Sequence, residues 1–138
     1  AADGLQKSRG LVCSRCGASV DFGQVRRLAR ACLEQVADAS GLVEDAERAS
    51  GKGVQARAEA AASAAVAAVA ACERRFAASS SHVAAAHDVA ARALCAANRF
   101  SDALPHARTA LEHARRLGGG GAVGPALARE QHKVAQIA

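Results

Sequence analysis

Apolar residues recur at helical spacing along most of this chain. From Asp21 onward, one apolar face takes positions i, i+3, i+4, i+7 and i+11, which are Val25, Leu28, Ala29, Cys32 and Val36. That periodicity is typical of an amphipathic helix. Asp21 followed three residues later by Gln24 resembles a capping box and predicts a helix start at Asp21. Since Cys32 falls on the apolar face, we expect it to be a small core residue rather than a ligand.

Polar and helix-breaking residues divide the rest of the chain. The polar stretch from Asp38 to Gly53 predicts a break, with at most one short helical turn around Leu42 to Arg48. The further predicted helices span residues 54–77, 82–97, 101–117 and the end of the chain from Pro125, after the glycine-rich loop 118–124. The expected buried side of the helix at 54–77 carries Val66, Val69, Cys72 and Phe76. Residues 1–20 predict an irregular or hairpin segment, and no strand is expected beyond them. The fold class is therefore all-α, with antiparallel helical hairpins.

One stretch, "AARALCAANRFSDALPHARTAL" from Ala90 to Leu111, has the spacing of a tetratricopeptide-like helical hairpin. Asn98 replaces the usual turn glycine and tolerates left-handed backbone geometry. We expect Ser101 to cap the second helix, with Pro105 inside its first turn, where a missing N–H costs least. Phe100 and Leu111 are expected to fill the interface between the two helices.

Alanine dominates the composition, with 39 residues, while the aromatics are three phenylalanines. Alanine favours helices but buries little surface, so we expect close-packed helices with a thin core. The net charge of +5 comes with no Tyr or Trp and no dense basic stripe, which argues against a nucleic-acid interface. No strongly apolar run predicts a membrane span. Five cysteines without a regular framework favour a reducing compartment, the cytosol or nucleus.

The stretch "RGLVCSRCGASVD" carries Cys13 and Cys16 in a C-x-x-C followed by Gly17. Structural zinc fits this pattern, because such a turn directs backbone N–H groups at two thiolates. Zinc needs four ligands, however, and the chain offers no second C-x-x-C, C-x-x-H or H-x-x-x-H. A thioredoxin-like redox pair and two unmetallated surface cysteines remain as alternatives. The simplest account of a zinc site places the missing ligand pair upstream of Ala1.

Other cysteines and histidines are poor candidates to complete that site. They lie far along the chain on predicted helices, at Cys72, Cys95, His82, His87, His106, His113 and His132. Each histidine is expected at the surface or at the edge of the core. The chain also lacks a phosphate-binding glycine motif and a nucleophile motif, so it is not expected to be an enzyme complete in itself.

The order of these features resembles the C-terminal part of SET-MYND protein lysine methyltransferases, most closely those of plants and algae. "GLVCSRCG" resembles the last cysteine pair of the family's post-SET segment. The stretch from Val89 to Ala138 resembles the helices of its tetratricopeptide-like domain, with Pro125 kept at a turn where the family's histidine is absent. The resemblance implies two parts, a partial post-SET-like cysteine segment at 1–20 and a truncated helical domain at 21–138.

Under this resemblance, Cys13 and Cys16 are structural zinc ligands and no catalytic residue carries over. The catalytic SET domain, with its bound S-adenosylmethionine, would lie upstream, because the chain has no N-H-S segment and no tyrosine. The absence of an initiator Met favours a chain that starts mid-protein or was processed. The helical domain would limit access of protein substrates, and Arg108, Arg115 and Arg116 could meet acidic target segments. The alternative is a free-standing tetratricopeptide-like adaptor that binds proteins or peptides without metal.

Overall fold

The computed structural model describes residues 10–117 and 135–137, and within them the protein is all-α apart from one small hairpin. The elements are β1 (Gly10–Val12), β2 (Ser19–Asp21), α2 (Phe22–Arg48), α3 (Val54–Arg75), α4 (Ser81–Ala96) and α5 (Phe100–Leu117). Residues 135–137 are also helical. The all-α prediction is confirmed, and the segment before the first helix is an antiparallel hairpin in which Leu11 pairs with Val20.

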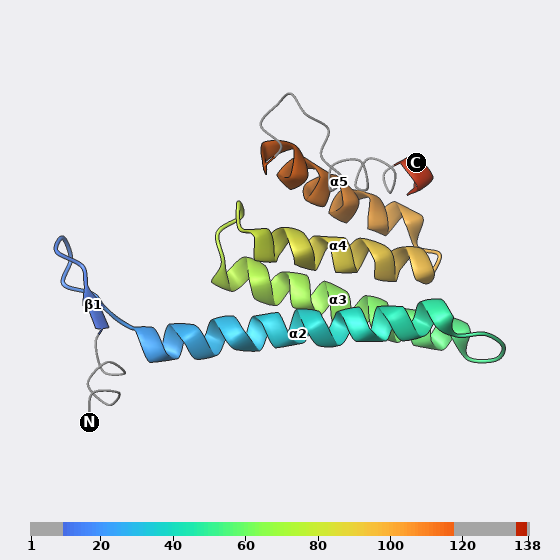
Figure 1. The fold of residues 1–138 in the computed structure, drawn as a ribbon, viewed down its shortest axis with the longest axis horizontal. Helices are drawn as coiled ribbons and strands as arrows, with labels where there is room; N and C mark the ends of the chain where they lie inside the picture. Colours follow the sequence, from blue (N-terminus) through green and yellow to red (C-terminus); the bar gives the residue numbers. More distant parts are fainter. Residues whose placement is uncertain (1–9, 118–134, 138) are drawn as a thin grey trace.

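The four helices form consecutive antiparallel layers (Figure 1). Helix α3 packs on α2 and α4, and α4 packs on α5, while α2 also contacts α4. The N-terminal part of α2 extends past the end of α3, and the hairpin β1–β2 stands at its far end (Figure 1). The molecule therefore has two regions, a packed bundle and a projecting arm. We define the arm as residues 10–33, whose last residues already reach the bundle, since Cys32 is buried in its core.

Helix α2 begins as the sequence predicts but continues much further. Asp21 is its N-cap, and the carboxylate accepts hydrogen bonds from the backbone N–H groups of Gly23 and Gln24 at 2.8 and 3.4 Å. The predicted break from 38 to 53 is wrong for residues 38–48, because the helix runs through Gly41 to Arg48, and is confirmed for residues 49–53. A helical glycine costs about 1 kcal/mol relative to alanine. Burial of Ala39, Val43 and Ala46 against the bundle offsets that cost.

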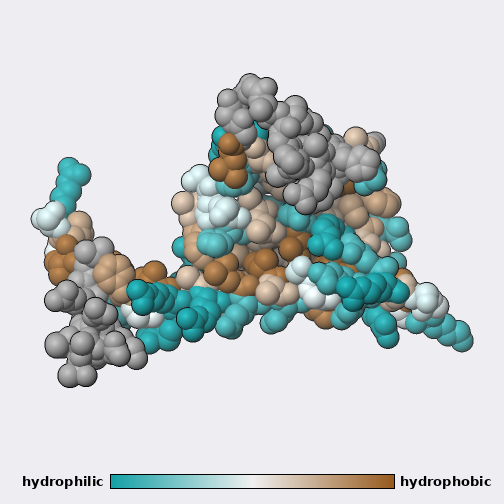
Figure 2. All heavy atoms as spheres, in the orientation of Figure 1, coloured by the Kyte–Doolittle hydropathy of each residue, from teal (hydrophilic) through white to brown (hydrophobic). Residues whose placement is uncertain are grey.

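The core of the bundle consists mainly of alanine. Buried residues include Ala58, Ala61, Ala62, Ala65, Ala68, Ala90, Ala93, Ala103 and Ala107, with Val43, Cys72 and Leu94 as the largest fully buried side chains. In Figure 2 hydrophobic atoms lie between α2 and the next helices, and hydrophilic atoms line the outer edge of α2. The expected buried side of α3 is confirmed at Val69 and Cys72 and in part at Phe76, but Val66 is exposed. Val66 is exposed because it lies off the stripe of α3 formed by the buried positions 58, 61, 62, 65, 68, 69 and 72.

The turn between α4 and α5 and the helix that follows it confirm two predictions and correct three. Asn98 has φ of 61°, the left-handed conformation expected from its place in the turn. Ser101 is not the cap, because α5 already begins at Phe100, so Pro105 lies in the second helical turn rather than the first. Its missing N–H would have paired with the carbonyl of Ser101, which is an exposed residue open to water. Phe100 is 48% exposed and does not fill the interface, whereas Leu111 is buried.

Within the described ranges, none of the helices has the length and apolar character needed to cross a membrane. The predicted glycine loop at 118–124 and the start of the last helix at Pro125 lie outside the described residues.

Candidate functional site

Cys13 and Cys16 lie at the tip of the hairpin, in a tight turn closed by backbone hydrogen bonds. The N–H of Gly17 donates to the carbonyl of Cys13 at 2.9 Å, and the N–H of Cys13 donates to the carbonyl of Ala18 at 2.7 Å. Gly17 has φ of 72°, a conformation that side chains with a Cβ rarely adopt. The turn therefore holds both cysteines on one short loop, as a C-x-x-C metal knuckle requires.

The electrostatics of this turn favour the thiolate. Hydrogen bonds from the backbone N–H groups of Arg15 and then Cys16, followed by one from the Cys16 side chain, lower the pKa of Cys13 below its ordinary value. Both cysteines are free and exposed. Since a thiolate is the form that binds zinc, these two residues are suited to donate two sulfur ligands.

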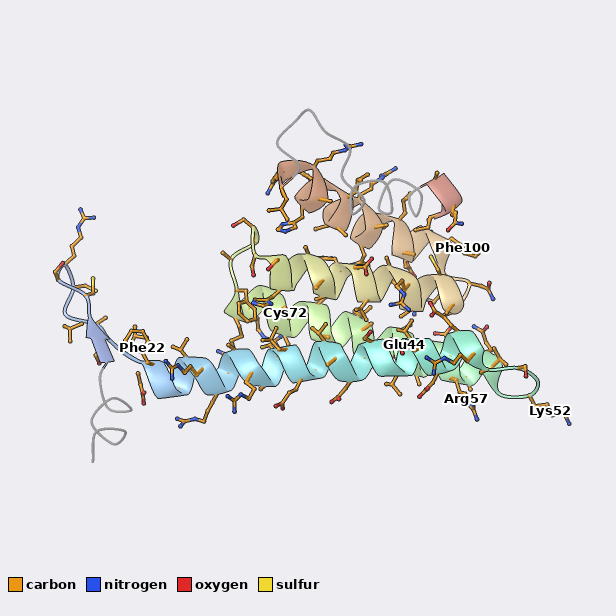
Figure 3. All side chains as sticks on the ribbon, viewed as in Figure 1. Phe22, Glu44, Lys52, Arg57, Cys72 and Phe100 are labelled. Atoms are coloured by element: carbon orange, nitrogen blue, oxygen red, sulfur yellow. The ribbon has the colours of Figure 1, made fainter. Side chains whose placement is uncertain are left out.

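The remaining cysteines and histidines are placed elsewhere. Cys32 and Cys72 are buried in the bundle core. This confirms the prediction that Cys32 is a core residue, and its Sγ donates to the Ala71 carbonyl at 3.6 Å. Burial raises the pKa of Cys72, which keeps it a protonated core thiol. Figure 3 shows Cys72 inside the bundle and Phe22 on the arm. Across residues 10–117 and 135–137, no three His, Cys, Asp or Glu side chains are arranged so that they could hold a metal ion, and His132 lies outside these ranges.

The arm that carries the knuckle exposes large apolar side chains beside positive charge. Val12, Val20, Phe22, Val25 and Leu33 are between 39% and 66% exposed. Val25 was expected on the buried face, and the prediction is wrong because α3 does not reach this part of α2. The first twelve residues of α2, from 22 to 33, contain three exposed arginines and no acidic residue. These arginines are Arg26, Arg27 and Arg30.

A polar cluster, which we call the histidine clasp, joins three helices at Glu73, His87 and His106. His87 Nε2 lies 2.9 Å from Glu73 Oε1, and His87 Nδ1 lies 2.8 Å from His106 Nδ1. His87 is only 8% exposed. The expectation that every histidine lies at the surface or core edge is therefore wrong for His87, because its partners on α3 and α5 satisfy both ring nitrogens.

An apolar groove opens where α4 meets α5. Its volume is about 450 Å³, and its lining includes Cys95 and Ala96 of α4, Phe100 of α5 and Ile137. Glu47 and Arg92 stand at its edge and pair with each other at 2.9 Å. Burial raises the pKa of Cys95, so its thiol is a protonated, weakly polar part of the wall.

Sequence reasoning identified the cysteine turn but not the clasp or the groove. The separation of nineteen residues from His87 to His106 gives no periodic signal, and the meeting of the two side chains depends on how α4 and α5 pack. A hint was available, because His87 falls among the apolar positions Val83, Ala86 and Ala90 of one predicted helix.

Comparison with known proteins gives no counterpart, since no family model, no curated protein and no solved structure matches this chain.

Proposed function

We propose that this chain is the C-terminal helical portion of a SET-MYND-like protein-lysine N-methyltransferase, and that it controls access of protein substrates. The observation that carries the proposal is the composition of the arm, which combines two of the four ligands that a zinc site needs with an exposed apolar surface. Both features call for a neighbouring structure that supplies two more ligands and covers the apolar residues. An upstream SET domain with its own cysteines meets both needs.

Zinc would be held by Cys13 and Cys16 together with two ligands from outside the described residues. The exposed thiols and the N–H groups directed at Cys13 Sγ suit this role. Structural zinc sites are closed by four protein ligands, so the knuckle joins the arm to whatever supplies the other pair. Zinc would therefore stabilise the structure of the arm. S-adenosylmethionine would bind in the SET domain and not in this chain.

The bundle would form one wall of the substrate cleft. Its four antiparallel helices are consistent with a tetratricopeptide-like arrangement, in which stacked helical hairpins present an extended surface. Of the three arginines expected to meet acidic targets, Arg116 pairs with Glu112 at 2.7 Å, while Arg108 and Arg115 are exposed. We assign Arg108 and Arg115 to contacts with acidic protein segments.

The second candidate function is a free-standing adaptor. The observation that favours it is the groove beside Cys95 and Phe100, because an apolar hollow between helices suits a bulky side chain of a bound peptide. An adaptor of this kind needs neither the cysteine pair nor a covering domain for the arm.

The test uses the complete polypeptide that the gene encodes. Its coding sequence is read upstream of Ala1, and the purified protein is assayed for methyl transfer from labelled S-adenosylmethionine to protein lysines. Bound zinc is counted by mass spectrometry in the wild type, in the Cys13→Ser/Cys16→Ser double variant and in a matched control, Cys95→Ser. We expect methyl transfer, and the loss of one zinc in the double variant alone.

A polypeptide without a SET domain and without methyl transfer would refute the methyltransferase assignment and leave the adaptor. Equal zinc content in the wild type and the double variant would separately refute the role of the knuckle.

A further inference from the structure

We propose that Glu73, His87 and His106 form a proton-dependent clasp between α3, α4 and α5. The clasp keeps α5 docked while the two imidazoles carry no added proton or one. It releases α5 when the imidazoles bind a second added proton. The device is independent of the proposed methyltransferase function. It rests on the two short contacts of His87, to a carboxylate on one side and to an imidazole on the other.

The contacts determine where the protons lie. Because Glu73 is a carboxylate and can only accept, His87 must carry its proton on Nε2 and donate to it. The Nδ1 atom of neutral His87 is then an acceptor, so His106 must donate its own Nδ1–H across the 2.8 Å contact. Both imidazoles are neutral in this arrangement, and Nε2 of His106 has no proton.

One additional proton fits this arrangement. It can occupy Nε2 of His106, whose Nδ1–H continues to donate, or Nδ1 of His87, if His106 changes tautomer and accepts. Either state places one positive charge near the Glu73 carboxylate. A second proton does not fit, because both Nδ1 atoms would then carry hydrogen and two cations would face each other at 2.8 Å. The contact must open for the second proton to bind.

Charges around the clasp support this order. Burial, and then the neighbouring His87, lower the pKa of His106 below its ordinary value of 6.5, while Glu73 and Asp102 oppose the shift. The groups that face His106 are therefore Glu73 from α3, His87 from α4 and Asp102 from its own helix. A histidine with a lowered pKa in the fold contributes stability that is present above 6.5 and is lost as the pH falls.

The surrounding interface makes α5 sensitive to this contact. The buried residues of α5 are Ala103, Ala107, Ala110 and Leu111, so three of its four buried side chains are alanines. Alanines bury little apolar area, and the clasp thus carries a large share of the docking specificity. Because Phe100 of α5 lines the groove beside Cys95, release of α5 also removes one wall of that groove.

The experiment measures amide hydrogen exchange of the whole chain at pH 7.5, 6.5 and 5.5, with rates normalised to the intrinsic exchange rate at each pH. The variant is His106→Asn, whose side-chain NH2 can replace the Nδ1–H donor but cannot take a proton. The matched control is His82→Asn, at an exposed histidine of α4 that is outside the clasp. Helix α3 serves as the internal reference.

In the wild type and in His82→Asn, we expect protection of α5 to fall by up to about tenfold per pH unit below 6.5, the linkage of one proton. Protection of α3 should fall less, and α5 of His106→Asn should be insensitive to pH. A parallel loss of α5 protection in wild type and His106→Asn would overturn the proposal.

Imidazole NMR of the wild type provides a second measurement if His106→Asn does not fold. We expect the Nε2–H tautomer of His87 at pH 7.5, and protonation of the His106 ring below its ordinary pKa of 6.5. Protonation of the His106 ring at or above pH 6.5 would equally overturn the proposal.

Discussion

The bundle and the arm use apolar residues in opposite ways. In the bundle, the buried positions are mostly alanines, and Leu94 is the largest fully buried side chain. On the arm, Phe22, Val25 and Leu33 have larger side chains than alanine and yet remain 39% or more exposed. Size therefore does not decide burial in this protein. Small residues are buried because they let helices approach closely, whereas the large residues of the arm lie on the hairpin or on the face of α2 that no described helix covers.

The difference indicates that the bundle has a packed core of its own, although Leu42, Val66, Phe100 and Leu117 stay exposed on it, whereas the arm has no such core. An apolar surface beside three arginines and two exposed thiols has the composition of a contact surface rather than of a solvated helix end. The following experiments probe this contrast, from the largest expected effect to the smallest.

Thiol alkylation should give the largest difference between the two regions. With iodoacetamide at neutral pH, we expect Cys13 and Cys16 to react at least about a thousandfold faster than Cys32 and Cys72, whose modification requires opening of the bundle. The lowered pKa of Cys13 and the raised pKa of Cys72 act in the same direction. Peptide mass spectrometry over time gives the four rates, and comparable rates would show that the core opens readily.

Truncation of a large side chain should separate the regions by stability. Leu94→Ala removes the largest fully buried side chain of the bundle and should lower the free energy of unfolding by about 2–5 kcal/mol. The matched variant Leu33→Ala lies on the arm and should cost less than about 1 kcal/mol. Urea denaturation followed by circular dichroism at 222 nm measures both, and equal losses would mean that the arm is packed as tightly as the bundle.

Enlargement of an alanine tests the close approach of the helices. Ala62 is fully buried on α3, so Ala62→Leu should destabilise the protein by about 1–3 kcal/mol through overpacking. Ala67 is on the same helix and is exposed, so Ala67→Leu should change stability by less than about 0.5 kcal/mol. A neutral Ala62→Leu, again in urea denaturation, would show that the alanine core contains unfilled space.

Removal of a helix cap should have the smallest effect, and a different one in each region. Ser80 caps α4 within the bundle by accepting from the His82 N–H at 3.1 Å, so Ser80→Ala should lower global stability by about 1 kcal/mol. Asp21→Ala removes the cap of the arm helix and should increase amide exchange only near Phe22, with little change in global unfolding. A global loss from Asp21→Ala would contradict the separation of arm and bundle.

Local chemistry explains which parts of the fold were predictable. The cap at Asp21 and the left-handed turn at Asn98 were predicted, because each depends on one residue and its near neighbours. The break expected after Asp38 was wrong, because the cost of Gly41 is local while the burial of Val43 comes from helices later in the chain. Phe100 and Val66 were misplaced because helical periodicity does not say how close the next helix comes.

The candidate sites also divide into one that the local sequence predicts and one that depends on helix packing. The cysteine turn could be read from C-x-x-C-G, since four consecutive peptide units determine its geometry. The clasp could not, because a hydrogen bond between His87 and His106 requires the register of α4 against α5. The sequence by itself determined most of the helical segments, the cap at Asp21 and one tight cysteine turn, all of which depend on short-range backbone energetics. Only the tertiary structure decided which alanines are buried, that the arm projects, and that a carboxylate and two imidazoles meet, because helix packing sets these distances.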